Sequence, residues 1–251
     1  MKNSKRVQNL ILPIISVLSL IAIWGVTARV MGKEYILPTV ESTFSSMLKL
    51  FGELRFYRAL LFTVLRSLIA FSVSFILAFV FAYFSKKSQV FKKIISPFIS
   101  IMRALPTVAV ILLLIVWTNS YVAPVLVTMM VVLPTVYVSV YNSIDVVDDN
   151  LIETCKLFGL SDREILRKVQ IPQILPPMLL TIGTGISLNL KLMVAAEVLS
   201  ATSRSIGALL NNASQLAEVP QMLAIVVVTV ALGLIIEGVF SLLSKKVGKW
   251  K

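Results

Sequence analysis

Long uninterrupted apolar runs constrain this chain more than any other feature of its sequence. A helix rises 1.5 Å per residue and needs about 20 apolar residues to cross a bilayer. Runs near residues 60–84, 94–117 and 222–243 reach that length. Only 14% of the residues are charged and 57% are hydrophobic, whereas about a quarter of the residues of a typical soluble domain are charged. The sequence therefore predicts an integral membrane protein with several spans.

We expect an all-α membrane protein with about six transmembrane helices, because no strand alternation is long enough for an outer-membrane barrel. The spans are expected at about 10–27, 60–84, 94–117, 122–141, 177–199 and 222–243. The first run follows basic residues, so a cleaved signal peptide is an alternative there. Trp24 and Arg29 fit the interfacial end of an uncleaved anchor better than a small-residue cleavage site.

Lysines and arginines outside the spans predict the orientation of the chain. The net charge is +12, but the basic residues flank spans and form no soluble face for nucleic acid. They are Lys2, Lys5, Arg6, Lys86, Lys87, Lys92, Lys93, Lys245, Lys246, Lys249 and Lys251. Short loops rich in Lys and Arg stay in the cytoplasm. Six spans then place both termini and the connection at 145–176 in the cytoplasm, with the protein in the cytoplasmic (inner) membrane.

Several classes of chemistry are excluded by residue content. The chain has no His and one cysteine, Cys155, so a His metal site, a disulfide within the chain and a cysteine metal cluster are all ruled out. No G-x-x-x-x-G-K-[ST] phosphate loop occurs, so the chain does not hydrolyse ATP by that route. Asp148 and Asp149 are adjacent carboxylates, and they fit helix capping better than catalysis. We expect no metal, no cofactor and no enzyme activity.

Charged residues inside the predicted spans are candidates for a substrate pathway, because such charges are costly and usually face the interior. Arg103 lies about ten residues into its span, at a depth of about 15 Å, and Pro106 follows it closely. A broken helix beside a buried charge is typical of a substrate pathway. The alternative is a structural ion pair between Arg103 and Glu197. Arg66 is expected to extend to the outer interface.

The fifth span carries a stripe of small residues on one helical face. Gly183, Ser187 and Lys191 recur at intervals of four. Small residues let two helices approach closely, so Gly183 and Ser187 are predicted to pack against a neighbouring helix. Lys191 joins Arg103, Pro106 and Glu197 in the predicted pathway.

Between the fourth and fifth spans the sequence changes to a charged segment at 150–177. Apolar residues recur there at helical spacing on both sides of Gly159, which is placed to end a first short helix. Ser161 and Glu164 form the pattern of a capping box that begins a second. Pro172, with Pro176 and Pro177, is expected to close it. A second amphipathic segment, at 40–51, is predicted to lie along the membrane.

This charged segment resembles the coupling loop of binding-protein-dependent ABC transporter permeases. Glu153-Thr-Cys155, three residues, Gly159, nine residues and Val169-Gln-Ile-Pro172 match the spacing of the family pattern E-A-A-x3-G-x9-I-x-L-P. Substitutions within the pattern are small or conservative. Further segments resemble the sulfonate/taurine/nitrate-type subfamily: Thr63-x-x-Arg66, Met102-Arg103-Ala-Leu-Pro106 and Val194-Ala-Ala-Glu197. The resemblance runs from about residue 60 to the carboxyl end.

The resemblance implies a type I importer permease of the MetI-like fold. Residues 1–57 would form an anchor span and an extracytoplasmic surface segment, and residues 58–246 the permease domain with its cytoplasmic coupling loop at 145–176. The resemblance implies as partners two cytoplasmic ATPase subunits, an extracytoplasmic substrate-binding protein and a second permease copy, which the subfamily leads us to expect as an identical chain. The implied ATPase-coupling residues are Glu153, Cys155, Phe158, Gly159, Val169 and Pro172.

The substrate implied is a small solute, and Arg103 and Lys191, as two buried cations, would suit an anion such as a sulfonate. The main alternative is a secondary transporter or channel that acts without partners. It would need a coupling-ion site, and Glu197 and Glu237 are the only carboxylate candidates within the spans.

Overall fold

The computed structural model describes residues 2–248, with side chains from residue 11 onward except residues 13 and 14. All regular structure in this part of the chain is helical, which confirms the predicted all-α fold. The helices are α1 (Lys2–Met31), α2 (Val40–Phe51), α3 (Leu54–Lys87), α4 (Gln89–Ala104), α5 (Thr107–Trp117), α6 (Val122–Asp145), α7 (Asp149–Leu157), α8 (Asp162–Ile165), the π-helical turn η1 (Leu166–Gln170), α9 (Ile171–Leu199), α10 (Ile206–Gln215) and α11 (Val219–Val247). Outside the described residues lie Lys249, Lys251 and the side chains of Lys2, Lys5 and Arg6.

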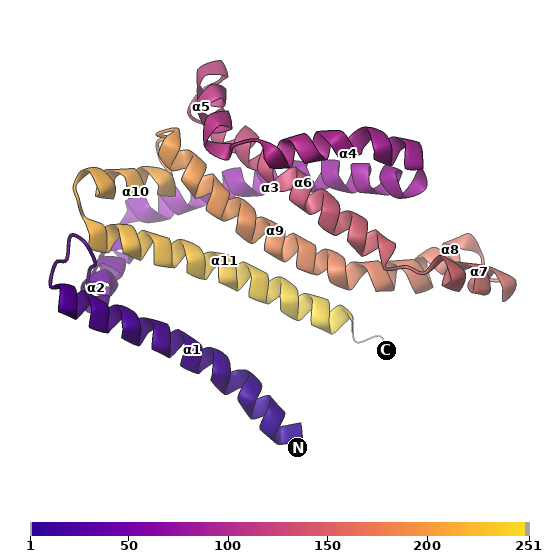
Figure 1. The fold of residues 1–251 in the computed structure, drawn as a ribbon, viewed down its shortest axis with the longest axis horizontal. Coiled ribbons are helices and arrows are strands. Elements are labelled where there is room, and N and C mark those ends of the chain that lie inside the picture. Colours follow the sequence, from indigo (N-terminus) through magenta and orange to yellow (C-terminus); the bar gives the residue numbers. More distant parts are fainter. Residues whose placement is uncertain (1, 249–251) are drawn as a thin grey trace. The chain divides into compact units, whose positions relative to one another are not determined.

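The chain divides into two compact units. The first unit is Met1–Tyr57 with Leu209–Val228, and the second is Arg58–Ala208 with Thr229–Lys251. The second unit holds most of the helices, and Figure 1 shows α6 and α9 side by side within it.

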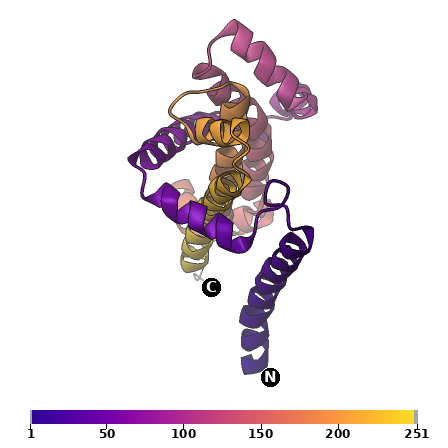
Figure 2. The same ribbon diagram turned by 90° about the vertical axis from the view of Figure 1, so that its left-hand side faces the viewer.

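In the first unit, a loop after α1 reverses the chain into α2. The indole Nε1 of Trp24 donates a hydrogen bond to the carbonyl oxygen of Pro38 at 3.0 Å, and Arg29 forms an exposed ion pair with Glu41 at 2.6 Å. Thr39 caps α2 by accepting a hydrogen bond from a backbone N–H of the first turn. Figure 2 shows α2 turned away from the direction of α1. The helix predicted at 40–51 is therefore confirmed as α2.

Within residues 2–248, four helical stretches are long and apolar enough to cross a membrane. They are Leu54–Lys87, Val122–Leu157, Asp162–Leu199 and Val219–Val247, and the pair α4 and α5 makes a fifth if it counts as one broken span. The predicted first span lies in α1, where the apolar helix Ile15–Met31 is shorter than these four.

The predicted third span, residues 94–117, is broken at Pro106. α4 and α5 meet at an angle of 95°, and α5 leaves the body of the unit in Figure 1. Leu105 has an extended backbone with ψ 131°, because the ring of the following proline disfavours the helical conformation at that position. The break beside Arg103 that the sequence predicts is therefore present.

Helices α3, α4, α6 and α9 form the core of the second unit. The buried side chains are Phe71, Ala78, Ala82, Ile99, Val132, Leu133, Val136, Tyr137, Val140 and Met178. On α9, a Cβ added to Gly183 would lie 2.6 Å from Phe240 Cβ of α11. Ser187 Oγ lies 2.8 Å from the place of a Cβ on Gly233. The predicted packing role of Gly183 and Ser187 is thus confirmed, since both positions hold α9 against α11.

Candidate functional site

The first short helix of the charged segment ends in a complete glycine cap. The Gly159 N–H donates to the Lys156 carbonyl at 2.9 Å, and the Leu160 N–H reaches back to the Cys155 carbonyl at 3.1 Å. These two bonds define a Schellman motif. Gly159 has φ +80°, a left-handed conformation in which a Cβ is unfavourable. The predicted end of the helix at Gly159 is confirmed.

The second helix begins with the predicted capping box. The Ser161 side chain accepts a hydrogen bond from the Glu164 N–H, and the Glu164 side chain accepts one from the Ser161 N–H at 3.2 Å. Glu164 also pairs with Lys168 one turn later at 2.9 Å. An ion pair of 3.4 Å between Lys156 and Asp162 spans the turn between the two helices. Local bonds therefore fix the turn.

The tip of this turn presents apolar side chains to the outside. Leu157 is 88% exposed and Phe158 is 80% exposed, whereas Ile165 on α8 is 2% exposed. A capped, ordered turn that keeps a leucine and a phenylalanine exposed at its tip is suited to binding a partner protein. We name Leu157 and Phe158 the apolar tip.

The second helix does not end where the sequence predicts, and the expectation that three prolines close it is wrong. The Ile171 N–H donates to the Leu166 carbonyl, so the chain widens into one π turn and then continues as α9. Pro172 stands in the first turn of α9, where a missing N–H is tolerated. Pro176 and Pro177 lie inside α9. α8, η1 and α9 thus form one continuous helical stretch.

The residues that the sequence predicts for coupling all lie on this segment. Glu153 and Phe158 are exposed, and Cys155, Val169 and Pro172 are half-buried. Cys155 and Gly159 belong to the glycine cap, and Pro172 follows the π turn. The segment therefore brings the predicted coupling residues onto one helical hairpin, which lies at one end of α9 in Figure 1.

The residues that the sequence predicts for a substrate pathway are not gathered in one cluster. Arg103 and Pro106 stand at the α4–α5 break, and Lys191 stands in α9 with its Cε 3.7 Å from the place of a Cβ on Gly233. Arg103 and Lys191 are exposed on this chain, so the prediction of two buried cations is wrong for the single chain. Among the described side chains neither forms an ion pair.

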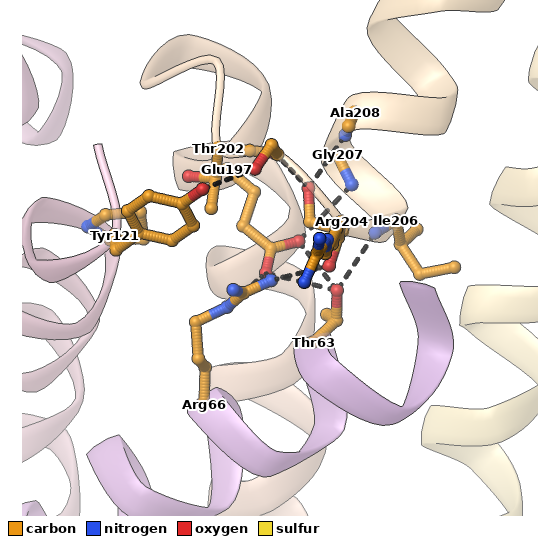
Figure 3. Close-up of polar contacts among 12 residues, drawn as sticks. Thr63, Arg66, Tyr121, Glu197, Thr202, Arg204, Ile206, Gly207 and Ala208 are labelled. Carbon is orange, nitrogen blue, oxygen red and sulfur yellow. Dashed lines mark hydrogen bonds and ion pairs between the residues drawn. The ribbon is translucent and has the colours of Figure 1, made fainter. Parts of the chain in front are cut away.

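Glu197 is the centre of a buried polar network at the carboxyl end of α9 (Figure 3). Its side chain is fully buried, and Arg66 of α3 lies 2.8 Å away through Nη2 and 3.0 Å away through Nε, both to Glu197 Oε1. Thr63 donates its hydroxyl to Glu197 Oε2 at 2.8 Å, and the Gly207 N–H donates to the same oxygen at 3.3 Å. Both carboxylate oxygens therefore have donors from this chain.

The network overturns two sequence predictions. The alternative ion pair between Arg103 and Glu197 is wrong, because Arg66 occupies the position of the partner. Arg66 does not extend freely to the interface either, since its side chain is 14% exposed and bound to Glu197. A carboxylate without water is stable only when it is paired and hydrogen-bonded, and Thr63 and Arg66, one helical turn apart on α3, supply both.

The same network holds the turn between α9 and α10. The Ile206 N–H donates to Thr63 Oγ1 at 2.9 Å, so α3 caps the first turn of α10 together with Glu197. Arg66 Nη2 also donates to the Arg204 carbonyl at 3.3 Å. Ala201 and Arg204 have positive φ values of 49° and 50°, which cost energy at residues other than glycine. We name Thr63, Arg66, Glu197 and the Ile206 and Gly207 amides the α9 cap network.

Gly207 is required by this geometry. A Cβ at Gly207 would lie 2.4 Å from Glu197 Cβ and 2.6 Å from Val198 N. The sequence pattern gives no sign of this requirement at Gly207, since it arises only when α10 folds back onto the end of α9. The spacing Thr63-x-x-Arg66 was a usable signal for the α3 side of the α9 cap network, because residues three apart share a helix face.

The chain is similar to known transport proteins over most of its length. Residues 70–249 match the family model of the binding-protein-dependent transport system inner membrane component. A Bacillus subtilis protein named as an aliphatic sulfonates transport permease, SsuC, is 26% identical over 97% of this chain and 87% of its own. The Escherichia coli protein of that name is 24% identical over 92% of this chain and 88% of its own.

Solved structures show the same fold at low sequence identity. A structure of the MetNI methionine ABC transporter in inward-facing conformations matches with a TM-score of 0.63 and 17% identity, over 76% of this chain and 95% of that chain. A structure of an amino acid ABC transporter with histidines matches with a TM-score of 0.60 and 19% identity, over 82% and 97%. With helices long enough to cross a membrane, an ordered hairpin between two of them and the match of residues 70–249, this chain belongs to the binding-protein-dependent transport system inner membrane component family, as a permease subunit of an ABC importer.

Proposed function

We propose that the apolar tip couples this permease to a cytoplasmic ATPase subunit. The observation that carries the proposal is the 88% and 80% exposure of Leu157 and Phe158 on a turn that two caps hold in place. A short helix with exposed apolar residues gains stability by inserting into a groove of a partner. Nucleotide-driven movement of two such partners would then be transmitted along α9, which continues from α8 without a break.

We also propose how the chain is oriented in the membrane and which subunits it assembles with. The connection at 145–176 would face the cytoplasm with both termini, and residues 58–246 would form the permease domain. A second copy of the chain, two ATPase subunits and an extracytoplasmic binding protein would complete the importer. By connectivity, α2 and α10 would lie on the opposite side of the membrane from the apolar tip. The first unit has a cavity of about 540 Å³, lined by Lys49, Glu53 and Glu218 among others. This polar cavity supports the proposal that the binding protein docks on that side of the membrane.

The proposed substrate is a small anion of the sulfonate type. Two relatives named as aliphatic sulfonates transport permeases support this class at 24–26% identity. Arg103 and Lys191 support it physically, because both cations are exposed and, among the described side chains, without an ion pair. In a dimer of permeases such cations could face a shared pathway.

Coupling is tested by co-expressing the chain with the phosphate-loop ATPase encoded nearest to it. The wild-type pair should copurify, and ATP hydrolysis should depend on both chains. Phe158→Asp should abolish copurification and stimulation, because a charge would have to be desolvated in the partner's groove. Val90→Asp changes an equally apolar side chain, 69% exposed at the start of α4, and should leave both unchanged. ATP-independent uptake by the chain alone would instead support a secondary transporter.

A further inference from the structure

A second cavity lies in the second unit, beside the root of the hairpin that carries the apolar tip. Its volume is about 260 Å³. Polar side chains from three parts of the chain line it, namely Tyr83, Lys86 and Lys87 at the end of α3, Asp149 at the start of α7, and Gln170 in η1. Aliphatic side chains complete its wall, among them Ile144 of α6 and Ile174 of α9. The lining therefore combines polar side chains with a larger aliphatic surface.

The cavity offers one charge of each sign without a hydrogen bond or ion pair among the described side chains, although the Asp149 carboxylate acts on Lys86 through space. Lys86 Nζ lies 2.6 Å from Asp145 Oδ1, so a partner already neutralises this lysine. Lys87 and Asp149 are exposed, and among the described side chains neither is bonded to another residue. An occupant that carries both an anion and a cation would satisfy the two together, whereas a purely anionic or purely cationic one would satisfy only one of them.

Aromatic residues place this cavity at the edge of the apolar part of α3. Tyr83 and Phe84 are 50% and 46% exposed, and the lysines Lys86 and Lys87 follow directly. Across the α3–α4 turn, Lys92 Nζ lies 4.4 Å from the ring centroid of Tyr141. Exposed aromatic rings followed by lysines are typical of the level of lipid headgroups. This pattern indicates that the cavity lies at the level of the polar part of the bilayer.

We propose that this cavity binds the headgroup of a phospholipid with a primary amine, of the phosphatidylethanolamine type. The lipid phosphate accepts hydrogen bonds from Lys87, and the ammonium group donates to the Asp149 carboxylate. The aliphatic wall contacts the first methylene groups of the acyl chains. A choline headgroup fits less well because its quaternary nitrogen has no N–H to donate.

The position of the site suggests what the lipid does. α7 and η1, which line the cavity, are the two arms of the hairpin, so a bound headgroup bridges them to the end of α3. This consequence, unlike the lipid site itself, rests on the proposed coupling function of the apolar tip. A bridged hairpin is held in one position for the ATPase, so the lipid raises the ATP hydrolysis that transport requires.

The site is tested on the full chain, purified and reconstituted in lipid nanodiscs that hold equal amounts of ethanolamine, choline and glycerol phospholipids. Native mass spectrometry then measures which lipid stays bound. We expect ethanolamine lipid to be retained about tenfold over choline lipid, the ratio expected from one charge-assisted hydrogen bond. Equal retention of all three lipids, or preference for the glycerol lipid, would overturn the proposal.

Two variants and one matched control locate the site. Lys87→Gln should remove the retention of ethanolamine lipid, and Asp149→Asn should remove its preference over choline lipid. Lys93→Gln changes an exposed lysine near the start of α4 that is not part of the cavity lining, and it should change nothing. Equal loss in all three variants would show attraction to surface charge alone and refute the site.

A soluble zwitterion could supply the same phosphate and ammonium groups as the lipid headgroup. Competition with phosphoethanolamine distinguishes the two ligands. If the cavity takes a lipid, millimolar phosphoethanolamine should leave lipid retention unchanged, because it lacks the acyl chains. Saturable binding of phosphoethanolamine that displaces the lipid would assign the cavity to a soluble ligand and overturn the proposal. These binding measurements require no ATPase, so their outcome is independent of whether the proposed coupling function is correct.

Discussion

The Nη2 atom of Arg66 lies 2.8 Å from the Oε1 atom of Glu197, a residue 131 positions later in the chain. This ion pair ties α3 to the carboxyl end of α9. Replacing Arg66 by Met should leave a buried carboxylate without its cation, and removal of one partner of such a pair costs about 3–5 kcal/mol. We expect the free energy of unfolding of the purified chain in detergent to fall by that amount.

The control for this prediction is Arg204→Met. Arg204 contributes only its backbone carbonyl to the α9 cap network, and its exposed side chain should be replaceable at little cost. In the double variant Arg66→Met/Glu197→Gln, the neutral amide no longer needs a cation, so part of the lost stability should return. If the losses of stability in Arg66→Met alone and in Glu197→Gln alone simply added up to the loss in the double variant, the pairing would be contradicted.

Gly207 should tolerate no side chain. Gly207→Ala would place a Cβ 2.4 Å from Glu197 Cβ and 2.6 Å from a backbone nitrogen, so α10 would have to move away from the cap network. Overpacking of this kind costs about 1–3 kcal/mol, which thermal denaturation would report as a lower Tm. Gly238→Ala is the matched control, since nothing lies within 4 Å of a Cβ there. An equal Tm in both variants would refute the close approach.

Local features of this chain could be predicted from its sequence, because neighbouring residues determine them. The glycine cap at Gly159, the capping box at Ser161 and the break at Pro106 each depend on bonds or clashes within a few residues. The continuation of α8 into α9 could not be predicted, because the prolines that suggested an end are accommodated by a π turn. A π turn has no strong signal in residue types.

Long-range pairing was the part of the site that the sequence could not specify. Arg66 and Arg103 were both available as partners for Glu197, and hydropathy does not distinguish between them. The fold selects Arg66, because α3 and α9 pack so that Thr63 and Arg66 contact the carboxyl end of α9. Two turns earlier on α9, the Asn189 side-chain amide donates a hydrogen bond to the Ser67 carbonyl at 2.6 Å. Arg103 is exposed and lies three residues before Pro106, at which α4 and α5 meet at 95°.

The left-handed backbone at Gly159 predicts an order of effects on coupling. With φ +80° and nothing within 4 Å of a Cβ, a substitution there meets backbone strain of about 1–2 kcal/mol and no clash. Gly159→Asn should be tolerated better than Gly159→Val, because asparagine enters this region more readily and a β-branched residue rarely does. ATPase stimulation by the reconstituted importer should therefore rank wild type, Asn, then Val. Membrane insertion should be equal in all three, and an inverted rank would contradict a role for the cap.

Arg103 predicts the charge of the substrate. If this exposed cation at the α4–α5 break lines the pathway, Arg103→Ala should lower uptake of anionic sulfonates by about tenfold, the value of one charge-assisted contact, and leave neutral solutes unaffected. Lys191→Ala should act in the same direction if both cations meet the same anion. Lys93→Ala removes an equal charge from the start of α4 and serves as the control. Uptake in proteoliposomes, measured at equal protein density, tests this prediction, since an anion that loses one of its cations in a water-poor pathway is desolvated with less compensation. Unchanged transport of every anion by Arg103→Ala would remove this residue from the pathway and leave its role to the bend beside it.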